Sequence, residues 1–195
     1  MNKLAFIFLI YNCINHEELW YMFFNNIDKS KYSIYIHYKY DERLEFLEEY
    51  KVAKSIPTKY ADISIVKAQN YMLQEALKDV DNTHFIFLSG ACVPLKPFTQ
   101  IYNSLDAKYS YFHIANPKDC FPDCKEALLY IDEKFINKAS QWCILNRKHS
   151  ELLVNAGALK DPKDNYLSWF KNAYAPDELC YITYLSYIYG DVLKY

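Results

Sequence analysis

The stretch that decides the fold is Phe85-Ile86-Phe87-Leu88-Ser89-Gly90. Four consecutive apolar residues closed by Ser-Gly are typical of a short strand that is buried on both faces. Two similar apolar runs precede it, at residues 3–10 and 33–38. Because all three runs are continuously apolar rather than alternating, they predict a parallel sheet that is covered on both sides.

Outside these runs the apolar residues mostly follow the spacing of helices. The pattern predicts helices at 16–24, 41–51, 63–80, 98–105, 148–155, 166–172 and 177–189, and two further strands at 109–114 and 140–145. Asp62 or Ser64 is expected to cap the 63–80 helix, while Gly157 and Gly190 are expected to end helices. Strands that alternate with helices predict an α/β fold, a mostly parallel sheet with helices on both faces. No repeat or linker divides the chain, so we expect one domain over residues 1–195.

Composition excludes some classes of function. The chain of 195 residues is 52% hydrophobic, and its net charge of −2 argues against a nucleic-acid partner. Its 20 Tyr and 12 Phe suit half-buried sheet faces or sugar-contacting surfaces, and a compositional bias explains them equally well. The first apolar run is too short for a transmembrane segment, which needs about 20 residues, and no signal-peptide cleavage site follows it. We therefore expect a cytoplasmic protein, with peripheral membrane association as an alternative.

Six cysteines are scattered along the chain, and only Cys120 and Cys124 form a local pair. This pair lies in an expected long loop at 116–137 and is open to three interpretations: two loop thiols, a disulfide, or half of a zinc site. No second Cys/His pair with matching spacing is present, so no metal site is predicted.

Several phosphate and nucleophile motifs are missing. The chain has no G-x-G-x-x-G, no G-x-x-x-x-G-K-[ST] and no G-x-S-x-G, which argues against dinucleotide-binding, P-loop and α/β-hydrolase activities. No D-x-D follows the strand that ends at Leu88, where many sugar-nucleotide enzymes hold a divalent ion. Ligands of such folds bind at the carboxyl ends of the strands, which directs attention to residues 11–15, 37–40, 89–92 and the segment after 114.

Six segments in a fixed order over residues 4–189 carry a resemblance to a known family. They lie at 6–10 with 19–24, 32–37, 56–59 with 62–68, 85–95, 138–142 and 175–178. The most specific of them is Phe85-Ile86-Phe87-Leu88-Ser89-Gly90-Ala91-Cys92-Val93-Pro94-Leu95. Together they resemble the core-2/I-branching β-1,6-N-acetylglucosaminyltransferases, glycosyltransferase family 14, including its plant members.

The resemblance implies a GT-A-like, Rossmann-type fold and an inverting, metal-independent transfer that needs no cofactor. The donor would be a UDP-sugar, commonly UDP-N-acetylglucosamine, and the acceptor a glycan hydroxyl. Glu178, in Ala175-Pro176-Asp177-Glu178, matches the family's catalytic glutamate and would act as general base. The alternative is an acidic residue that simply favours the first turn of a helix. Asp177 is expected to cap the helix or to orient its neighbour.

The same resemblance implies five further substrate-binding residues. His37 stands at the position of a nucleotide-side histidine, and a structural role is equally expected. Ser64 matches a serine of the family signature or caps its helix. Ser89 and Gly90 end a strand where backbone can approach a ligand, or they form a plain turn. Trp142 would stack on the acceptor sugar or pack in the core.

Three departures from the family pattern stand out. Cys92 lies where many relatives carry an acidic residue, and Lys39 lies about where animal members have an aspartate, with Asp41 as a nearby substitute. Basic residues after the glutamate neutralise the leaving diphosphate in the family, yet here only Lys194 is basic among the 17 residues after Glu178.

The third departure leaves three readings. Lys59, Arg147 or Lys148 takes the role of the basic tail, a metal is recruited, or the domain binds a nucleotide sugar or glycan without catalysis. Nothing in the sequence indicates an oligomeric state.

Overall fold

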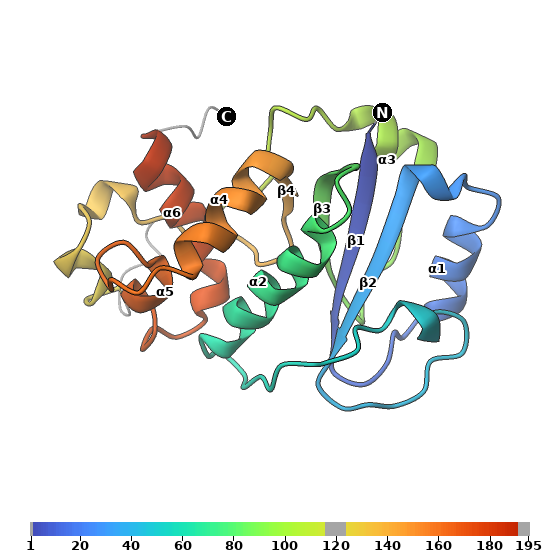
Figure 1. The fold of residues 1–195 in the computed structure, drawn as a ribbon, viewed down its shortest axis with the longest axis horizontal. Helices are drawn as coiled ribbons and strands as arrows, with labels where there is room; N and C mark the ends of the chain where they lie inside the picture. Colours follow the sequence, from blue (N-terminus) through green and yellow to red (C-terminus); the bar gives the residue numbers. More distant parts are fainter. Residues whose placement is uncertain (1, 116–123, 191–195) are drawn as a thin grey trace.

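A four-stranded sheet in the order β2-β1-β3-β4 organises the computed structural model, which describes residues 2–115 and 124–190. β1 (Lys3–Ile10) pairs in parallel with β2 (Tyr32–Tyr38) and with β3 (Asn82–Ser89). The short β4 (Ile144–Asn146) runs antiparallel to β3. The predicted α/β fold with a mostly parallel sheet is confirmed (Figure 1).

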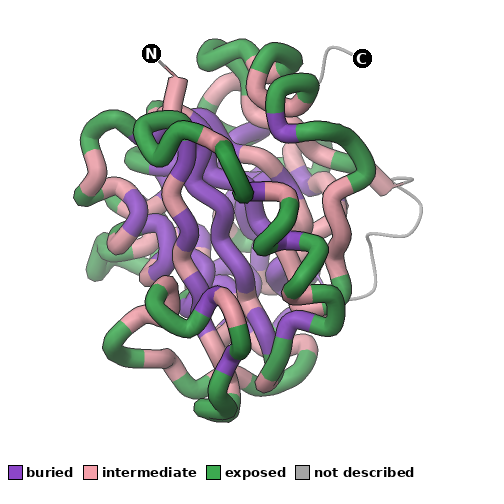
Figure 2. The backbone as a smooth tube through the Cα atoms, turned by 90° about the vertical axis from the view of Figure 1, so that its right-hand side faces the viewer, coloured by how far each residue is buried: buried purple, intermediate pink, exposed green. Residues whose placement is uncertain are grey.

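Helices cover both faces of this sheet, and the residues of β1 explain how. Leu4, Phe6 and Phe8 point into one apolar cluster with Trp20 and Phe98, whereas Ala5 and Ile7 point into a second cluster with residues from the other helices. α1 (Glu17–Phe24) and α3 (Phe98–Ser104) cover the first face. The second face is covered by α2 (Ser64–Leu77) and α4 (Arg147–Gly157), and α5 (Tyr166–Trp169) and α6 (Cys180–Tyr189) pack beside α4, beyond β4. Figure 2 shows the buried strands enclosed by exposed helix and loop surface.

Aromatic side chains fill the first cluster. The Phe6 ring lies 5.0 Å from the Phe24 ring, and Trp20 meets Phe8 edge-on at the same centre-to-centre distance. Each such buried side chain contributes roughly 1.5–3 kcal/mol to folding. Much of the high aromatic content therefore serves the core.

The helix predicted at 41–51 is wrong. Only a single 3-10 turn, Glu48–Tyr50, forms there. The carboxylate of Glu17 accepts the backbone N–H groups of Glu45, Phe46 and Leu47 at 2.7–3.0 Å, so these groups cannot bond within a helix. The local charge pattern resembled that of a surface helix, but a distant side chain determines the backbone path.

The strand predicted at 109–114 is also wrong. Tyr111 and Ile114 form only isolated bridges, to Ile144 and Ala139. The backbone N–H of Asn146 bonds to the Ser110 hydroxyl at 2.9 Å instead of to a backbone carbonyl, which interrupts the ladder.

The remaining predicted elements are present with shifted ends. The expected 140–145 strand is β4 at 144–146, the expected 166–172 helix ends at Trp169, and Gly157 belongs to the last turn of α4. The expected 177–189 helix begins as a 3-10 turn, Pro176–Glu178, before α6. Gly190, with φ 75°, ends α6 as expected. Of the loop expected at 116–137, residues 124–137 contain two 3-10 turns, Ala127–Leu129 and Glu133–Phe135, and residues 116–123 lie outside the described part.

Candidate functional site

A pocket of about 210 Å³ opens at the carboxyl ends of β1 and β2, the edge of the sheet at which ligands of such folds bind. It is lined by residues 9–11 at the end of β1, by His37 on β2 and Lys39 after it, by residues 58–60 with Ile65, and by Gln141 and Trp142. Among the sequence-predicted residues, the structure places His37 and Trp142 in its wall. Glu178, Ser64, Ser89, Gly90 and Asp177 are not lining residues.

His37 is held inside the wall of the pocket rather than presented to it. The residue is only 2% exposed, and its Nε2 atom lies 3.1 Å from the Ile56 backbone nitrogen and 3.1 Å from the Ser55 hydroxyl. That hydroxyl also bonds to the carbonyl of Tyr38. Burial lowers the pKa of His37, against a smaller opposing effect of the Ile56 carbonyl, so the ring is neutral at neutral pH. His37 therefore fixes the 55–56 segment against the end of β2.

Ser64 shapes the pocket without lining it. Its hydroxyl accepts the backbone N–H of Lys59 at 2.9 Å, closing the loop that carries Lys59 and Tyr60. Asp62 lies just before the helix, and its carboxylate accepts the N–H of Ser64, the first residue of α2, at 2.9 Å. Hydrogen bonds from Ser64 lower the pKa of Asp62, with smaller contributions from the charges of Lys59 and Lys67. Neither predicted residue is the N-cap, because that position is Ile63, which makes no side-chain cap hydrogen bond.

Trp142 fulfils the predicted core-packing role, and its predicted stacking on the acceptor sugar stays a prediction. Half-buried, it packs against the core cluster on the α2 side of the sheet and also lines the pocket. Its backbone N–H bonds to the Ser140 hydroxyl at 3.2 Å, which fixes the turn that presents it.

Glu178 lies in the 3-10 turn Pro176–Glu178, and a second motif segment holds it there. The backbone N–H of Ala139 donates to the Glu178 carbonyl at 2.9 Å, and the Lys138 ammonium lies 3.1 Å from the Glu178 carboxylate. The two last motif segments, 138–142 and 175–178, thus meet in space. The Glu178 side chain is 35% exposed, so its carboxylate is open to a ligand.

Two alanines in the left-handed region connect this turn to the pocket loop. Ala61 and Ala175 have φ of 52° and 51°, and the N–H of Ala175 bonds to the carbonyl of Ala61 at 3.4 Å. Next to them, the rings of Tyr60 and Tyr174 meet edge-on at 6.4 Å. A hydrogen bond with Tyr60 raises the pKa of Tyr174, and the charge of Glu178 adds to the effect. Since Tyr60 lines the pocket, this ring pair joins the pocket loop to the segment that precedes the turn of Glu178.

Asp177 points the other way, into the protein. It is 8% exposed, and its Oδ1 atom has no hydrogen-bond partner. Burial raises the pKa of Asp177 to about 6, with a smaller contribution from the charge of Glu178. The expected capping role is not observed, because no side-chain hydrogen bond caps either Pro176–Glu178 or α6.

Ser89 and Gly90 form a tight turn after β3. A Cβ on Gly90 would lie 2.3 Å from the backbone oxygen of Cys13, and the Gly90 carbonyl accepts the N–H of Asn15 at 2.8 Å. The Ser89 hydroxyl accepts the N–H of Ala91 at 3.1 Å. The close backbone approach that the sequence predicted is thus made to the loop after β1. Cys92 belongs to the same turn, with its Sγ atom 3.3 Å from the Ser89 nitrogen.

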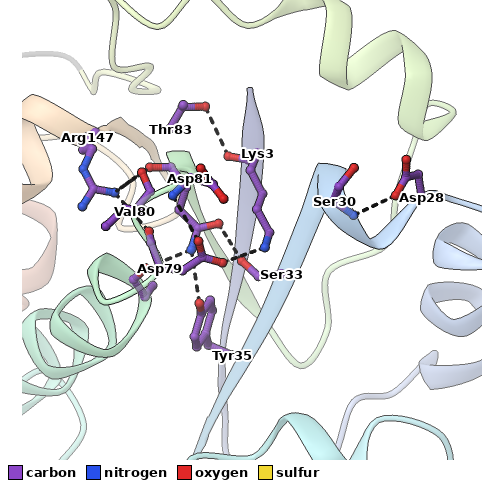
Figure 3. Close-up of polar contacts among 12 residues, drawn as sticks. Lys3, Asp28, Ser30, Ser33, Tyr35, Asp79, Val80, Asp81, Thr83 and Arg147 are labelled. Carbon is purple, nitrogen blue, oxygen red and sulfur yellow. Dashed lines mark hydrogen bonds and ion pairs between the residues drawn. The ribbon is translucent and has the colours of Figure 1, made fainter. Parts of the chain in front are cut away.

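The three basic residues proposed to replace the missing tail lie in two different places. Lys59 lines the pocket. Arg147 begins α4 at the opposite edge of the sheet, where its guanidinium donates to the carbonyls of Leu77, Asp79, Val80 and Asn82 (Figure 3). The adjacent Lys148 lies over the ring of Tyr189. Arg147 and Lys148 are therefore excluded as pocket cations in this conformation, and Lys194 lies outside the described residues.

Lys39 is a pocket cation that sequence reasoning missed. It was noted only as a departure from an expected aspartate, although it directly follows β2 and lies at the ligand-binding edge. Its ammonium lies over two rings, 5.0 Å from the centre of Tyr11 and 5.7 Å from that of Tyr40. Its position after the strand is the signal that could have identified it.

Comparison with known proteins identifies the family of the chain. A family model described as "Branch: Core-2/I-Branching enzyme" matches residues 4–191. The chain belongs to the Core-2/I-Branching enzyme family. "Glycosyltransferase BC10" of Oryza sativa subsp. japonica is 29% identical over 165 residues, which cover 78% of this chain and 40% of that protein. The chain thus spans less than half the length of this relative. The family resemblance expected from the motifs is confirmed.

Three further observations concern the described residues alone. No cluster of three or more His, Cys, Asp or Glu side chains is placed to hold a metal ion within residues 2–115 and 124–190. In the same ranges, no helix has the length and apolar character of a membrane span. Cys124 is buried, and Cys120 lies outside the described part, so the interpretation of this pair stays open.

Proposed function

We propose that this chain is an inverting glycosyltransferase. It moves a sugar, N-acetylglucosamine or a similar one, from a UDP-sugar to a glycan hydroxyl, with Glu178 as general base and without a metal. Membership of the Core-2/I-Branching enzyme family supports this proposal, as does the name of the rice relative. The observation that carries it is the contact between the turn of Glu178 and the pocket loop, made by the Ala175–Ala61 hydrogen bond and by the rings of Tyr60 and Tyr174.

In the proposed reaction, an acceptor hydroxyl attacks the anomeric carbon of the donor from the side opposite the diphosphate. The new bond joins that oxygen to the anomeric carbon, and the bond from the carbon to the β-phosphate oxygen breaks, with its electron pair leaving on the phosphate. The carboxylate of Glu178 takes the proton of the hydroxyl. Lys138, 3.1 Å away, holds this carboxylate until the acceptor displaces it.

The other predicted site residues fit the proposal to different degrees. Trp142 offers a ring to a sugar from the wall of the pocket. His37 and Ser64 act indirectly, by fixing segments 55–56 and 59–60. Ser89 and Gly90 support the turn beside the loop after β1, and Asp177 lies buried in the turn that carries Glu178.

Turnover of UDP-N-acetylglucosamine by the wild type and by Glu178→Gln tests the proposal. We expect kcat to fall about a hundredfold to ten-thousandfold, the usual contribution of a general base. Glu18→Gln, an exposed glutamate on α1, is the matched control and should keep full activity. Activity should persist in a chelator such as EDTA. Full activity of Glu178→Gln would remove Glu178 as the base.

A catalytically inactive domain that binds a nucleotide sugar or a glycan is the alternative. Calorimetry with UDP separates the two, because UDP binding without turnover would favour the inactive domain, and the absence of binding would contradict both. The cytoplasmic location expected from the sequence stays a prediction, and fractionation of cells producing the tagged chain would test it.

A further inference from the structure

We infer that Lys39 and Lys59 together bind the diphosphate of the donor and stabilise it as the leaving group. The inference rests on the proposed function and deepens it, since it assigns the charge that the family's basic tail would otherwise supply. Four observations at the pocket carry it.

The first observation is the charge of the pocket wall. Two lysines line it, and none of its lining residues is an aspartate or a glutamate. His37, the other basic lining residue, is kept neutral because burial lowers its pKa. Tyr11 stays neutral too, since a hydrogen bond with Tyr40 raises its pKa. The net charge of the wall is therefore positive and comes from Lys39 and Lys59.

The second observation is that Lys39 keeps its donors available. Its backbone N–H bonds to the carbonyls of Ile10 and Tyr11, both at 3.1 Å, so the residue is anchored beside the end of β1. Its ammonium contacts ring faces, and no carboxylate within the described residues forms an ion pair with it. Ring faces attract a cation without consuming its N–H groups as a carboxylate would. Lys51, by comparison, is bound by both Asp41 and Glu48.

The third observation is the anchoring of Lys59. The Ser64 hydroxyl accepts the backbone N–H of Lys59 at 2.9 Å, and Lys59 is an exposed residue that lines the pocket. No carboxylate within residues 2–115 and 124–190 forms an ion pair with Lys59, and one oxygen of the neighbouring Asp62 carboxylate accepts the N–H of Ser64. The charge of Lys59 lowers the pKa of Asp62 as a smaller contributor than the hydrogen bonds from Ser64.

The fourth observation is the orientation of α2. This helix of 14 residues starts at Ser64, and Ile65 in its first turn lines the pocket. The positive end of the helix dipole therefore adds to the field of the two lysines. As the bond to the sugar breaks, the diphosphate gains negative charge, and preorganised cations lower the energy of that transition state.

Calorimetry with UDP and with uridine, which lacks the phosphates, tests the inference. Each of Lys39→Met and Lys59→Met should weaken UDP binding about tenfold, and the double variant about a hundredfold if the effects add. Uridine binding should not change. The salt dependence of UDP binding should become less steep in each variant, because fewer charges are neutralised. In the turnover assay kcat should fall as well.

Lys67→Met is the matched control. It removes the same charge from an exposed lysine near the start of α2 that does not line the pocket. Its affinity for UDP should stay within about twofold of the wild type. Wild-type affinity in the double variant would overturn the inference and leave the proposed function standing. An equal loss of UDP and uridine binding would overturn it as well, because it would mean a distorted pocket. If the wild type itself binds no UDP, both the inference and the proposed function fail.

Discussion

The basic side chains at the two edges of the sheet have opposite surroundings. At the amino edge Arg147 donates to four backbone carbonyls and to Glu151, and Lys3 pairs with Asp79 at 2.6 Å (Figure 3). At the carboxyl edge Lys39 and Lys59 have no carboxylate in ion-pair contact among the described residues. The first arrangement satisfies the donors within the fold, and the second leaves them for a ligand.

The difference teaches which charges hold the fold and which are kept for binding. Arg147 joins α4 to the end of α2 and to the turn between α2 and β3. Its guanidinium donates to the Leu77 carbonyl, one of the last carbonyls of α2, which have no donor within the helix. The lysines of the pocket contribute little to such bonds. Substitutions at the two edges should therefore separate stability from binding.

Arg147→Met should have the largest effect on stability. The variant keeps much of the side-chain length but removes the donors of four carbonyls, so the free energy of unfolding should fall by about 3 kcal/mol. Urea denaturation followed by circular dichroism measures it. Lys148→Met, its neighbour with only a ring contact, is the control and should stay within about 0.5 kcal/mol of the wild type. If the free energy of unfolding of Arg147→Met falls by less than about 1 kcal/mol, the comparison fails. The cation at the amino edge would then stabilise the fold no more than the lysines at the carboxyl edge.

Asp177→Asn should act in the opposite direction and depend on pH. Burial raises the pKa of Asp177 from 3.8 to about 6, so between these values the folded state binds more protons than the unfolded state. The wild type therefore loses stability as the pH rises from about 4 to about 6, and the loss stays constant above that range. Asparagine removes this titration. At pH 7.5 the variant should be more stable by about 2 kcal/mol, and near pH 4 the two should agree.

Urea denaturation from pH 4 to 7.5 measures the difference between the two stability curves. Asp81 is an exposed aspartate near the amino edge and serves as the control. The difference in free energy of unfolding between Asp81→Asn and the wild type should not change with pH. A flat difference for Asp177→Asn as well would mean that the buried carboxyl costs the fold nothing. If the stability advantage of Asp177→Asn grows as the pH rises, the buried carboxylate next to Glu178 lowers the stability of the wild type. The carboxyl edge would then cost stability where the amino edge adds it.

The sequence predicts the sheet better than the segments around the site. The runs at 3–10, 33–38 and 85–88 have one interpretation each, because continuous apolar strands can be buried only in a covered sheet. The segment at 41–51 was misjudged because its path depends on Glu17, which is far away in the sequence. The same holds at the pocket, where Lys39 gained its significance only from the residues that surround it.

The motif residues show the same limit. The sequence places Lys138 and Glu178 in two separate motif segments. Only the fold brings these segments, 138–142 and 175–178, into contact. Gly90 was correctly expected to allow a close backbone approach, yet the identity of the approaching chain, the loop at Cys13, depends on tertiary packing.

Ser64→Ala should have the smallest effect, and it distinguishes anchoring from direct binding. The variant loses the hydroxyl that accepts the N–H of Lys59, which should lower the free energy of unfolding by about 1 kcal/mol. Because no charge is removed from the carboxyl edge, UDP affinity should fall only about threefold, as a looser loop holds Lys59 less well. Calorimetry and urea denaturation measure both quantities, and Ser104→Ala, at an exposed helix end, is the control. A loss of affinity as large as that of Lys59→Met would mean that the Ser64 hydroxyl itself contacts the ligand, and the division between anchoring and binding residues at this edge would have to be redrawn.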